Sequence, residues 1–282
     1  MVRVVRHRGP TDFLERAEPW LLAAEDRNNL ILGLAYGLAA RDADGSDVFY
    51  ATVERDDLVV GCALRTPPYK VLVTDAPPEA CEPLAEALSS AYDVIPAVLG
   101  PEPLAEAVAM AWVARRGGGW RPGMEQRVYR LDEVTPPSGV PGSLREANSG
   151  DVDLAVEWGA GFARDTGLRF AATRESIGGW VEKRQLFLWE DDEPRSIAVA
   201  HGRTPKGARV GYVYTPPESR GRGYASACVG ALSQGLLDGG VEFCVLYTDL
   251  SNPTSNAIYT RLGYYPIDDV RDVDLVPEVA SG

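Results

Sequence analysis

The sequence predicts an α/β (α+β) protein in which two domains of similar plan follow one another. Its 282 residues suit one large domain or two of ordinary size, and a hydrophobic fraction of 45% allows a buried core. The stretch 134–142, VTPPSGVPG, contains three prolines and two glycines and cannot continue a helix or a central strand. We therefore expect a semi-rigid linker at 134–142, which separates domains at 1–133 and 143–282.

A repeated order of short motifs in the two halves also points to two similar domains. Arg65-Thr66-Pro67 in the first half matches Arg203-Thr204-Pro205 in the second. Pro77-Pro78-Glu79 matches Pro216-Pro217-Glu218 at almost the same separation. This agreement indicates an internal duplication, with chance matches between short proline-containing motifs as the alternative.

Hydrophobic periodicity in the first half predicts helices, an antiparallel meander and then alternating strands and helices. Glu54 to Asp57 form a polar turn between two apolar runs, as in a β-hairpin. The expected elements are helices within 11–40, strands at 48–54, 58–65 and 69–74, a helix at 79–92, a strand at 94–99, a helix at 104–115 and a strand at 126–131.

The second half repeats this order. Gly239 and Gly240 end a helix that contains Val229, Leu232 and Leu236 at helical spacing. The expected elements are a strand at 144–147, helices at 151–163 and 174–183, strands at 185–190, 196–203 and 210–215, the helix up to Gly239, an apolar central strand at 243–249 and a helix from Asn252 to Leu262.

The turn between the strand at 210–215 and the following helix has the character of an anion site. Pro216 and Pro217 end the strand, and Gly221 and Gly223 permit positive φ and close approach to the backbone. Backbone N–H groups at a helix N-terminus favour a phosphate. The alternative is an ordinary surface loop. The turn lacks the Gly-Lys-Ser/Thr ending of a P-loop and the three-glycine dinucleotide pattern.

The turn and a second block further along the chain resemble those of the GNAT superfamily of acyl-CoA-dependent N-acyltransferases. Arg220-x-x-Gly223-x-Ala225 resembles the family's Arg/Gln-x-x-Gly-x-Gly/Ala signature. Asn252-Pro253, Tyr259 and Leu262-Gly263-Tyr264 follow at the family's usual separation. The resemblance covers about residues 143–270. It implies tandem GNAT-like folds, each a mixed, mostly antiparallel sheet flanked by helices.

The resemblance implies acetyl-CoA (coenzyme A) as the cofactor. The strand at 243–249 is expected to splay from the strand at 210–215, so that free backbone groups of the latter pair with the pantetheine amides. Tyr259 is expected to protonate the departing thiolate, with a simply packed tyrosine as the alternative. The expected cofactor-binding residues are Val213, Tyr214, Thr215, Arg220, Gly221, Arg222, Gly223, Tyr224, Ala225, Ser226 and Asn252.

Candidates for the acceptor site and the general base come from the segment between the first two strands of the second half. In relatives the segment between the first and second strands carries acceptor specificity, with ordinary packing of its side chains as the alternative. The strand at 210–215 holds no carboxylate, so either a remote base such as Glu157 acts through water or the amine arrives neutral. The expected acceptor-site residues are Phe162, Asp165, Phe170 and Trp180, of which Asp165 is a second candidate base.

The first copy lacks these features where the turn would sit. After Pro77-Pro78-Glu79 comes Ala80-Cys81-Glu82-Pro83, which has no glycine, two nearby carboxylates and a proline without an N–H. We expect the first domain not to bind coenzyme A.

Composition narrows the partners and the compartment. A net charge of −13 argues against nucleic acid and against an anionic membrane surface. The four cysteines show no C-x-x-C spacing and there are two histidines, so no metal site is expected and the thiols fit a reduced, cytoplasmic protein. The apolar stretch 30–40 is too short to span a bilayer.

The sequence thus predicts an N-acetyltransferase that acts by direct attack of an amine on acetyl-CoA, since neither Cys228 nor Cys244 is placed for an acyl-enzyme. The expected partner is a small-molecule or peptide amine, and the oligomeric state is open. Two alternatives stand beside this reading. One is a non-catalytic acyl-CoA-binding or regulatory module, and the other is an acyltransferase like mycothiol synthase.

Overall fold

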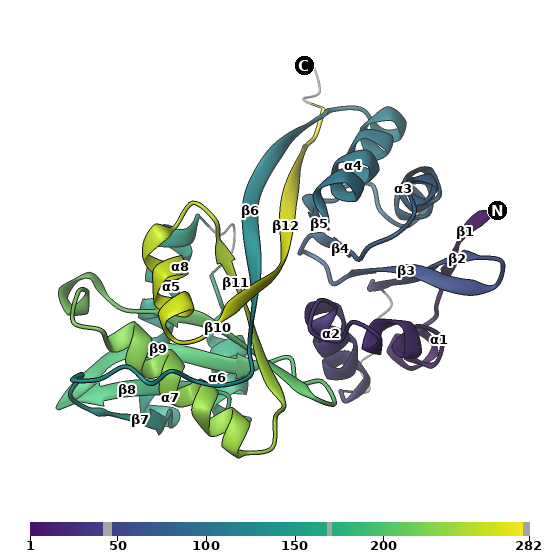
Figure 1. Ribbon diagram of the computed structural model, residues 1–282. Helices are drawn as coiled ribbons and strands as arrows, with labels where there is room; N and C mark the ends of the chain where they lie inside the picture. The colour runs from purple at the N-terminus through teal and green to yellow at the C-terminus, as the bar shows by residue number, and fades with distance from the viewer. Residues whose placement is uncertain (42–46, 168–170, 279–282) are drawn as a thin grey trace. The chain divides into compact units, whose positions relative to one another are not determined.

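The computed structural model describes residues 1–41, 47–167 and 171–278 as two compact units (Figure 1). Each unit is a mixed α/β structure with helices on both faces of a mostly antiparallel sheet, as the sequence predicts. Unit 1 comprises the described residues of Met1–Val128, Asp249–Ser251 and Ile267–Gly282, and unit 2 comprises those of Tyr129–Thr248 and Asn252–Pro266.

Two long strands contain residues of both units. They are β6 (Gly119–Leu131) and β12 (Tyr265–Val276). Division of the chain into domains at 1–133 and 143–282 stays a prediction. The compact units differ from that division because the described residues from Ile267 onward belong to the first unit.

The sheet of unit 1 has one parallel pair of strands, and its other pairs from β1 to β5 are antiparallel. β4 (Val71–Val73) and β5 (Ala97–Gly100) are the parallel pair. β1 (Val2–Arg6), β2 (Phe49–Arg55) and β3 (Leu58–Arg65) form an antiparallel meander beside it. β1 was not predicted, because Arg3 and Arg6 interrupt its short run of valines.

Neighbouring residues of β2 point into the two cores of unit 1. Phe49 packs with α3 (Cys81–Ala91) and α4 (Glu102–Arg116), whereas Tyr50 packs with α1 (Pro10–Leu22) and α2 (Asn29–Ala39). Successive strand residues face opposite sides of a sheet, so a single strand anchors both helical layers. Figure 1 shows the two helix pairs on opposite sides of β3.

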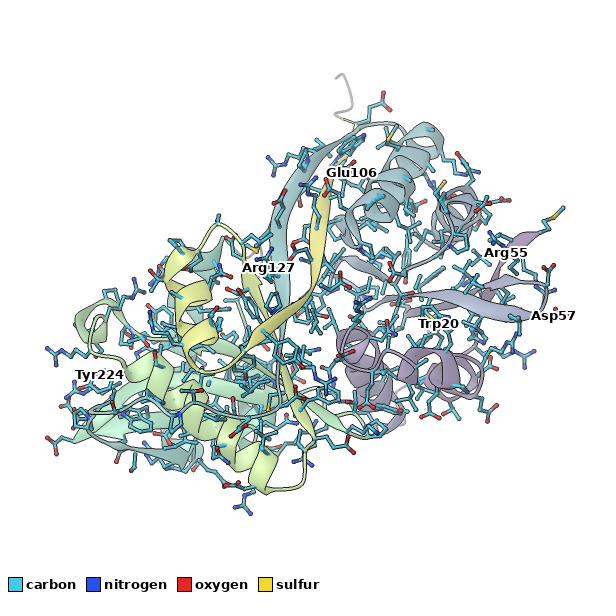
Figure 2. The ribbon with its side chains drawn as sticks, in the orientation of Figure 1. Trp20, Arg55, Asp57, Glu106, Arg127 and Tyr224 are labelled. Atoms are coloured by element: carbon cyan, nitrogen blue, oxygen red, sulfur yellow. The ribbon has the colours of Figure 1, made fainter. Side chains whose placement is uncertain are left out.

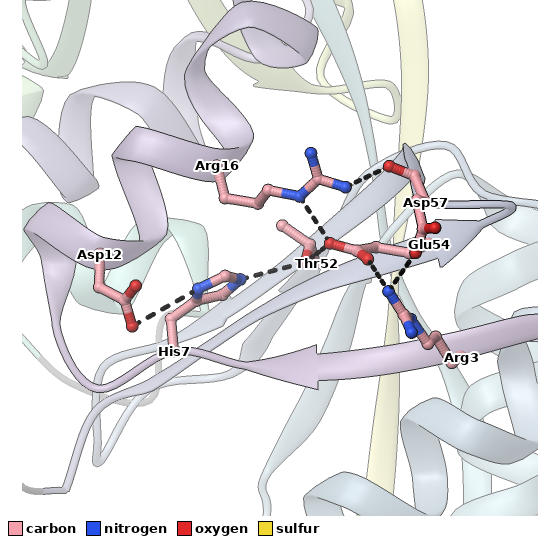
Figure 3. Close-up of polar contacts among 7 residues, drawn as sticks. All are labelled: Arg3, His7, Asp12, Arg16, Thr52, Glu54 and Asp57. Carbon is pink, nitrogen blue, oxygen red and sulfur yellow. Dashed lines mark hydrogen bonds and ion pairs between the residues drawn. The ribbon is translucent and has the colours of Figure 1, made fainter.

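A buried carboxylate lies at the centre of a polar network in unit 1 (Figure 3). Glu54 is 3% exposed and accepts hydrogen bonds from Arg16 Nε at 2.8 Å and Arg3 Nη2 at 2.9 Å. Thr52 Oγ1 lies 3.2 Å from Glu54 and 3.0 Å from His7 Nε2. Arg16, and then Arg3, lower the pKa of Glu54 to about 2 despite its burial. These bonds tie β1 and α1 to β2.

Unit 2 has the same plan. β10 (Gly207–Tyr214) and β11 (Phe243–Asp249) form a parallel pair, and the remaining strands pair antiparallel. Outward from β10 these strands are β9 (Glu193–His201), β8 (Leu186–Asp191) and β7 (Ser143–Glu146).

Two helices pack on each face of the sheet of unit 2. In β9, Ile197 packs toward α5 (Val152–Thr166) and α6 (Arg174–Glu182). Its neighbour Ala198 packs in the other core, with α7 (Tyr224–Asp238) and α8 (Pro253–Arg261). None of the helices in the described part of the chain combines the length and apolar character needed to cross a bilayer.

The order of elements repeats between the halves of the chain, in agreement with the predicted duplication. The repeats exchange a strand, however. β12 comes from the second repeat and pairs antiparallel with β5, with Val273 opposite Val98 and Arg271 opposite Gly100. Val273 and Leu275 lie in the core of unit 1. The sheet of unit 1 therefore includes a strand from the end of the second repeat.

The stretch 134–142, expected to be a linker, packs against unit 2. The Thr135 N–H donates to Leu262 O at 2.9 Å, and Trp189 Nε1 donates to Pro141 O at 2.8 Å. Val140 lies so close to Gly223 that a Cβ added there would be 2.9 Å from Val140 Cγ2. The stretch is thus held against the helix that follows the glycine-rich turn.

Candidate functional site

The parallel strands β10 and β11 are paired only at one end. Gly207 to Arg209 lie opposite Phe243 to Val245, and no further parallel pair joins the two strands in the described residues. The ladder between β9 and β10 also shifts between Gly211 and Tyr214, where Tyr212 has φ +54°. A bulge of this kind bends a strand and frees its backbone groups. The expected splay between the two strands is confirmed, and it opens toward their carboxyl ends.

The glycine-rich turn lies at the carboxyl end of β10. Gly221 has φ +76° and Gly223 has φ +84°, and α7 begins at Tyr224 without a side-chain cap. Within the described part of the chain, the N–H groups from Gly221 to Ser226 have no hydrogen-bond partner. Unsatisfied N–H groups at a helix N-terminus are the physical basis of an anion site. The turn therefore has the donors that a pyrophosphate requires.

The two glycines of the turn are needed for different reasons. A Cβ added at Gly221 would meet nothing within 4 Å, so the space beside this residue is open. A Cβ at Gly223 would meet Val140. Gly223 is thus required by the fold itself, whereas Gly221 leaves room for a ligand to approach the backbone.

The first residue of α7 is fixed by its side chain. Tyr224, labelled in Figure 2, is 3% exposed and donates its hydroxyl to Asp191 Oδ2 at 2.6 Å. Its ring packs in the core and its hydroxyl is bonded to Asp191, so only its backbone N–H is available to a ligand. Ala225 and Ser226 are half-buried and continue the first turn of the helix.

Arg220 joins the turn to α5. Its guanidinium forms an ion pair with Asp165, and its Nε donates to Thr215 O at 2.9 Å. Ser196 Oγ donates to Tyr214 O at 3.1 Å. Two of the three strand carbonyls expected to meet pantetheine therefore already accept one bond each, although a carbonyl oxygen has a second lone pair. Asp165 therefore pairs with the arginine of the glycine-rich turn.

Tyr259 lies in α8, whose N-terminus is capped as expected. Asn252 Oδ1 accepts the Ser255 N–H at 3.0 Å. Tyr259 is 8% exposed, and its hydroxyl has no hydrogen-bond partner among the described residues. Burial, and then Cys228, raise the pKa of Tyr259 to about 12, which keeps the phenol protonated at neutral pH. Tyr259 shares a core with Val213 of β10 and Tyr224 of α7.

Two of the expected acceptor residues meet on the other face of β10. The Phe162 ring centroid lies 4.8 Å from that of Tyr212, and the Trp180 centroid lies 4.9 Å from it. Trp180 also contacts His201 edge-on, with centroids 6.3 Å apart. Phe170 lies outside the described residues.

Sequence reasoning missed Tyr212, His201 and Arg209 at this position. The available signal was a charged residue, Arg209, inside an otherwise apolar strand, and one of only two histidines in the chain. His201 was expected only as part of the strand at 196–203, and Arg209 lies one residue before the strand expected at 210–215, whereas β10 begins at Gly207.

The thiols of unit 2 are unsuited to nucleophilic chemistry. Burial raises the pKa of both Cys228 and Cys244 to about 12. Among the described residues, no cluster of His, Cys, Asp or Glu has an arrangement that would hold a metal ion.

The corresponding turn of unit 1 is built differently. A short 3₁₀ turn at Pro78–Ala80 leads directly into α3, and Ala80 has helical backbone angles. Glu79 and Glu82 stand at this corner and are paired with Arg55 and Arg115. No positive-φ glycine is found between Pro77 and Glu82.

Comparison with known proteins supports the fold that holds these features. A family model described as FR47-like protein matches residues 193–272, which contain the splayed strands, the turn and α8. A Drosophila protein of solved structure is 14% identical, with a TM-score of 0.72, over 98% of this chain and 99% of that chain. No protein of curated function matches the sequence.

Two further solved structures are informative. A GNAT-family acetyltransferase from Colwellia psychrerythraea is 12% identical, with a TM-score of 0.55, over 99% of this chain and all of that chain. A tandem GNAT protein from the clavulanic acid biosynthesis pathway is 15% identical, with a TM-score of 0.55, over 99% and 100% of the two chains. At these identities the likeness concerns the fold, and it extends over both repeats.

Proposed function

Because the chain has a two-domain GNAT fold, we propose that it is an acetyl-CoA-dependent N-acetyltransferase acting on the primary amine of a small-molecule or peptide acceptor. The turn at Gly221 to Ser226 carries this proposal, because its N–H groups have no partner among the described residues and Gly221 leaves the backbone accessible. The corner of unit 1 has no such turn, so the activity is assigned to unit 2.

The residues of unit 2 fit the cofactor in two places. The N–H groups of the turn and the positive end of the α7 dipole would hold the pyrophosphate. The bulged part of β10, next to Val213, would pair with the pantetheine amides as an added strand does. When bound, acetyl-CoA supplies a thioester carbonyl that a neutral amine attacks, with cleavage of the carbon–sulfur bond.

The chain's own residues would handle the protons. Tyr259 donates its phenolic proton to the leaving sulfur, and its hydroxyl is not engaged elsewhere in the described structure. General acids of this kind contribute roughly 10²- to 10⁴-fold to rate. β10 has no carboxylate and Asp165 is paired with Arg220, so we propose that the amine loses its proton through water.

The test is release of coenzyme A thiol from acetyl-CoA in the presence of a diverse panel of amines, combined with calorimetric titration of coenzyme A. Saturable binding and amine-dependent thiol release are expected. Binding without transfer to any amine would favour a non-catalytic acyl-CoA-binding module. Absence of binding would remove the proposal.

A further inference from the structure

Arg209 of β10 is a buried cation with no counterion among the described residues. Its side chain is 9% exposed, and no carboxylate among the described residues forms an ion pair with it. Its Nη1 is buried and lacks a hydrogen-bond partner in the described structure. Burial lowers the pKa of Arg209, but a guanidinium stays protonated at neutral pH. An uncompensated buried charge destabilises a fold, so its presence calls for a ligand.

The neighbours of Arg209 do not neutralise it. Arg209 Nε donates to His201 Nε2 at 3.3 Å, which makes the imidazole an acceptor. Burial, and then Arg209, hold the pKa of His201 well below its ordinary value, so this ring is neutral. The guanidinium also lies over Gly202, where an added Cβ would be 3.2 Å from its central carbon. The guanidinium thus packs directly against Gly202, where any larger residue would crowd it.

A chain of side-chain contacts connects Arg209 to Trp180, which was expected at the acceptor site. Arg209 contacts His201, His201 meets the edge of Trp180, and Trp180 meets Tyr212. A cation therefore stands at one end of a row of rings on the α5 and α6 face of β10. Rings of this kind accept apolar parts of a ligand.

The site is separate from the proposed pyrophosphate site. Arg209 and Tyr214 are five residues apart on one strand, which at a rise of about 3.3 Å per residue places them at most ~17 Å apart, because the bulge between them shortens the strand. The glycine-rich turn lies beyond Tyr214. Arg209 stands instead at the last paired position before β10 and β11 splay, opposite Val245.

We propose that Arg209, oriented by His201, binds the carboxylate of the acceptor, so that the acceptor is an amine that also carries a carboxylate, such as an amino acid. This inference rests on the proposed N-acyl transfer and specifies its acceptor. A guanidinium matches a carboxylate with two parallel hydrogen bonds, and Nη1 supplies a donor that is otherwise unused.

The test compares acceptors that differ only in the carboxylate, using the full chain. Thiol release from acetyl-CoA is measured with phenylalanine against phenethylamine and with glycine against methylamine. We expect kcat/KM to be about 10- to 100-fold higher for the carboxylated member, and this preference to vanish in Arg209→Met. Arg203→Met, an exposed arginine of the same hairpin, is the matched control and keeps the preference.

A second readout does not depend on catalysis. The amino acids alone, without acyl-CoA, are expected to raise the Tm of the wild-type protein and of Arg203→Met, but not that of Arg209→Met. The Tm of ligand-free Arg209→Met is expected to equal or exceed that of the wild type, since an uncompensated charge is replaced by an apolar side chain.

The outcomes separate the two proposals. Thiol release with equal rates for both members of each pair would overturn the carboxylate assignment while leaving N-acyl transfer intact. A lower Tm of Arg209→Met together with unchanged selectivity would mean that Arg209 has a structural role and would also overturn it. No thiol release with any amine would refute the proposed function instead.

Discussion

Arg220 of the glycine-rich turn and Asp165 near the end of α5 form an ion pair in unit 2. Arg220 also donates to Thr215 O, so one guanidinium bridges the end of β10 and the helix that contributes Phe162 to the aromatic row. The arginine of the turn was expected from the sequence to contact the cofactor. Here the arginine side chain orders the turn from within the fold.

Replacing Asp165 tests whether it holds the turn or takes a proton. Both partners are about half exposed, so the pair contributes only about 0.2–1 kcal/mol. Asp165→Asn is expected to weaken coenzyme A binding a few-fold and to leave the shape of the pH–rate profile unchanged. A loss of kcat by two or more orders of magnitude, reversed at high pH, would instead identify Asp165 as the general base.

Tyr259→Phe separates proton donation from packing. The hydroxyl has no partner among the described residues, so its removal is expected to leave Tm and coenzyme A affinity close to wild type. Turnover is expected to fall roughly 10²- to 10⁴-fold. Tyr129→Phe is the control, because Tyr129 is a neighbouring ring whose hydroxyl contacts Asn256 Oδ1 at 3.0 Å. That control should lose about 1 kcal/mol of stability and keep its turnover.

Gly221→Ala tests close approach of a ligand to the turn. The left-handed conformation at φ +76° costs an alanine about 1–2 kcal/mol, although the space for a Cβ is open. A modest fall in Tm and a larger fall in coenzyme A affinity are expected from calorimetry. Gly235→Ala, in the exposed interior of α7, should raise stability by about 0.5–1 kcal/mol without affecting binding. Equal affinity in both variants would argue against contact at Gly221.

Acid sensitivity of unit 1 should depend on Glu54. Its pKa is about 2 in the folded protein, below the ordinary value of 4.5, so its network stabilises the fold above pH 4.5. That stabilisation is lost as the pH falls from 4.5 toward 2, because the carboxylate then takes up a proton. The Tm difference between wild type and Glu54→Gln should therefore be largest at neutral pH and shrink through this window. A difference that is constant with pH would contradict this role.

Local sequence patterns predicted most of the fold, but they did not predict the pairing of its last strand. The meanders, the glycine-ended helices and the splay follow from periodicity and from turn chemistry near each element. β12 was not predicted because Asp268, Asp269 and Asp272 break its apolar alternation. Its pairing with β5 joins Val273 to Val98, which no local pattern specifies.

The site was predictable as far as backbone motifs describe it. The turn and Tyr259 belong to contiguous signatures, and their surroundings agree with the expected geometry. The roles of Arg209 and His201 arise from contacts across β9 and β10 and with α6, so the sequence offered only their unusual residue types. The ion pair between Asp165 and Arg220 was likewise not foreseen, because its partners lie 55 residues apart in the sequence.

Because β5 pairs with β12, the sheet of unit 1 can be completed only late in biosynthesis. A ribosome that has completed the first repeat has produced every element of unit 1 except β12, so β5 still lacks its neighbour on one side. Unpaired strand edges invite association with other chains. The nascent first half must therefore remain incomplete, and exposed to such mispairing, until residues 267–276 have been synthesised and have left the exit tunnel.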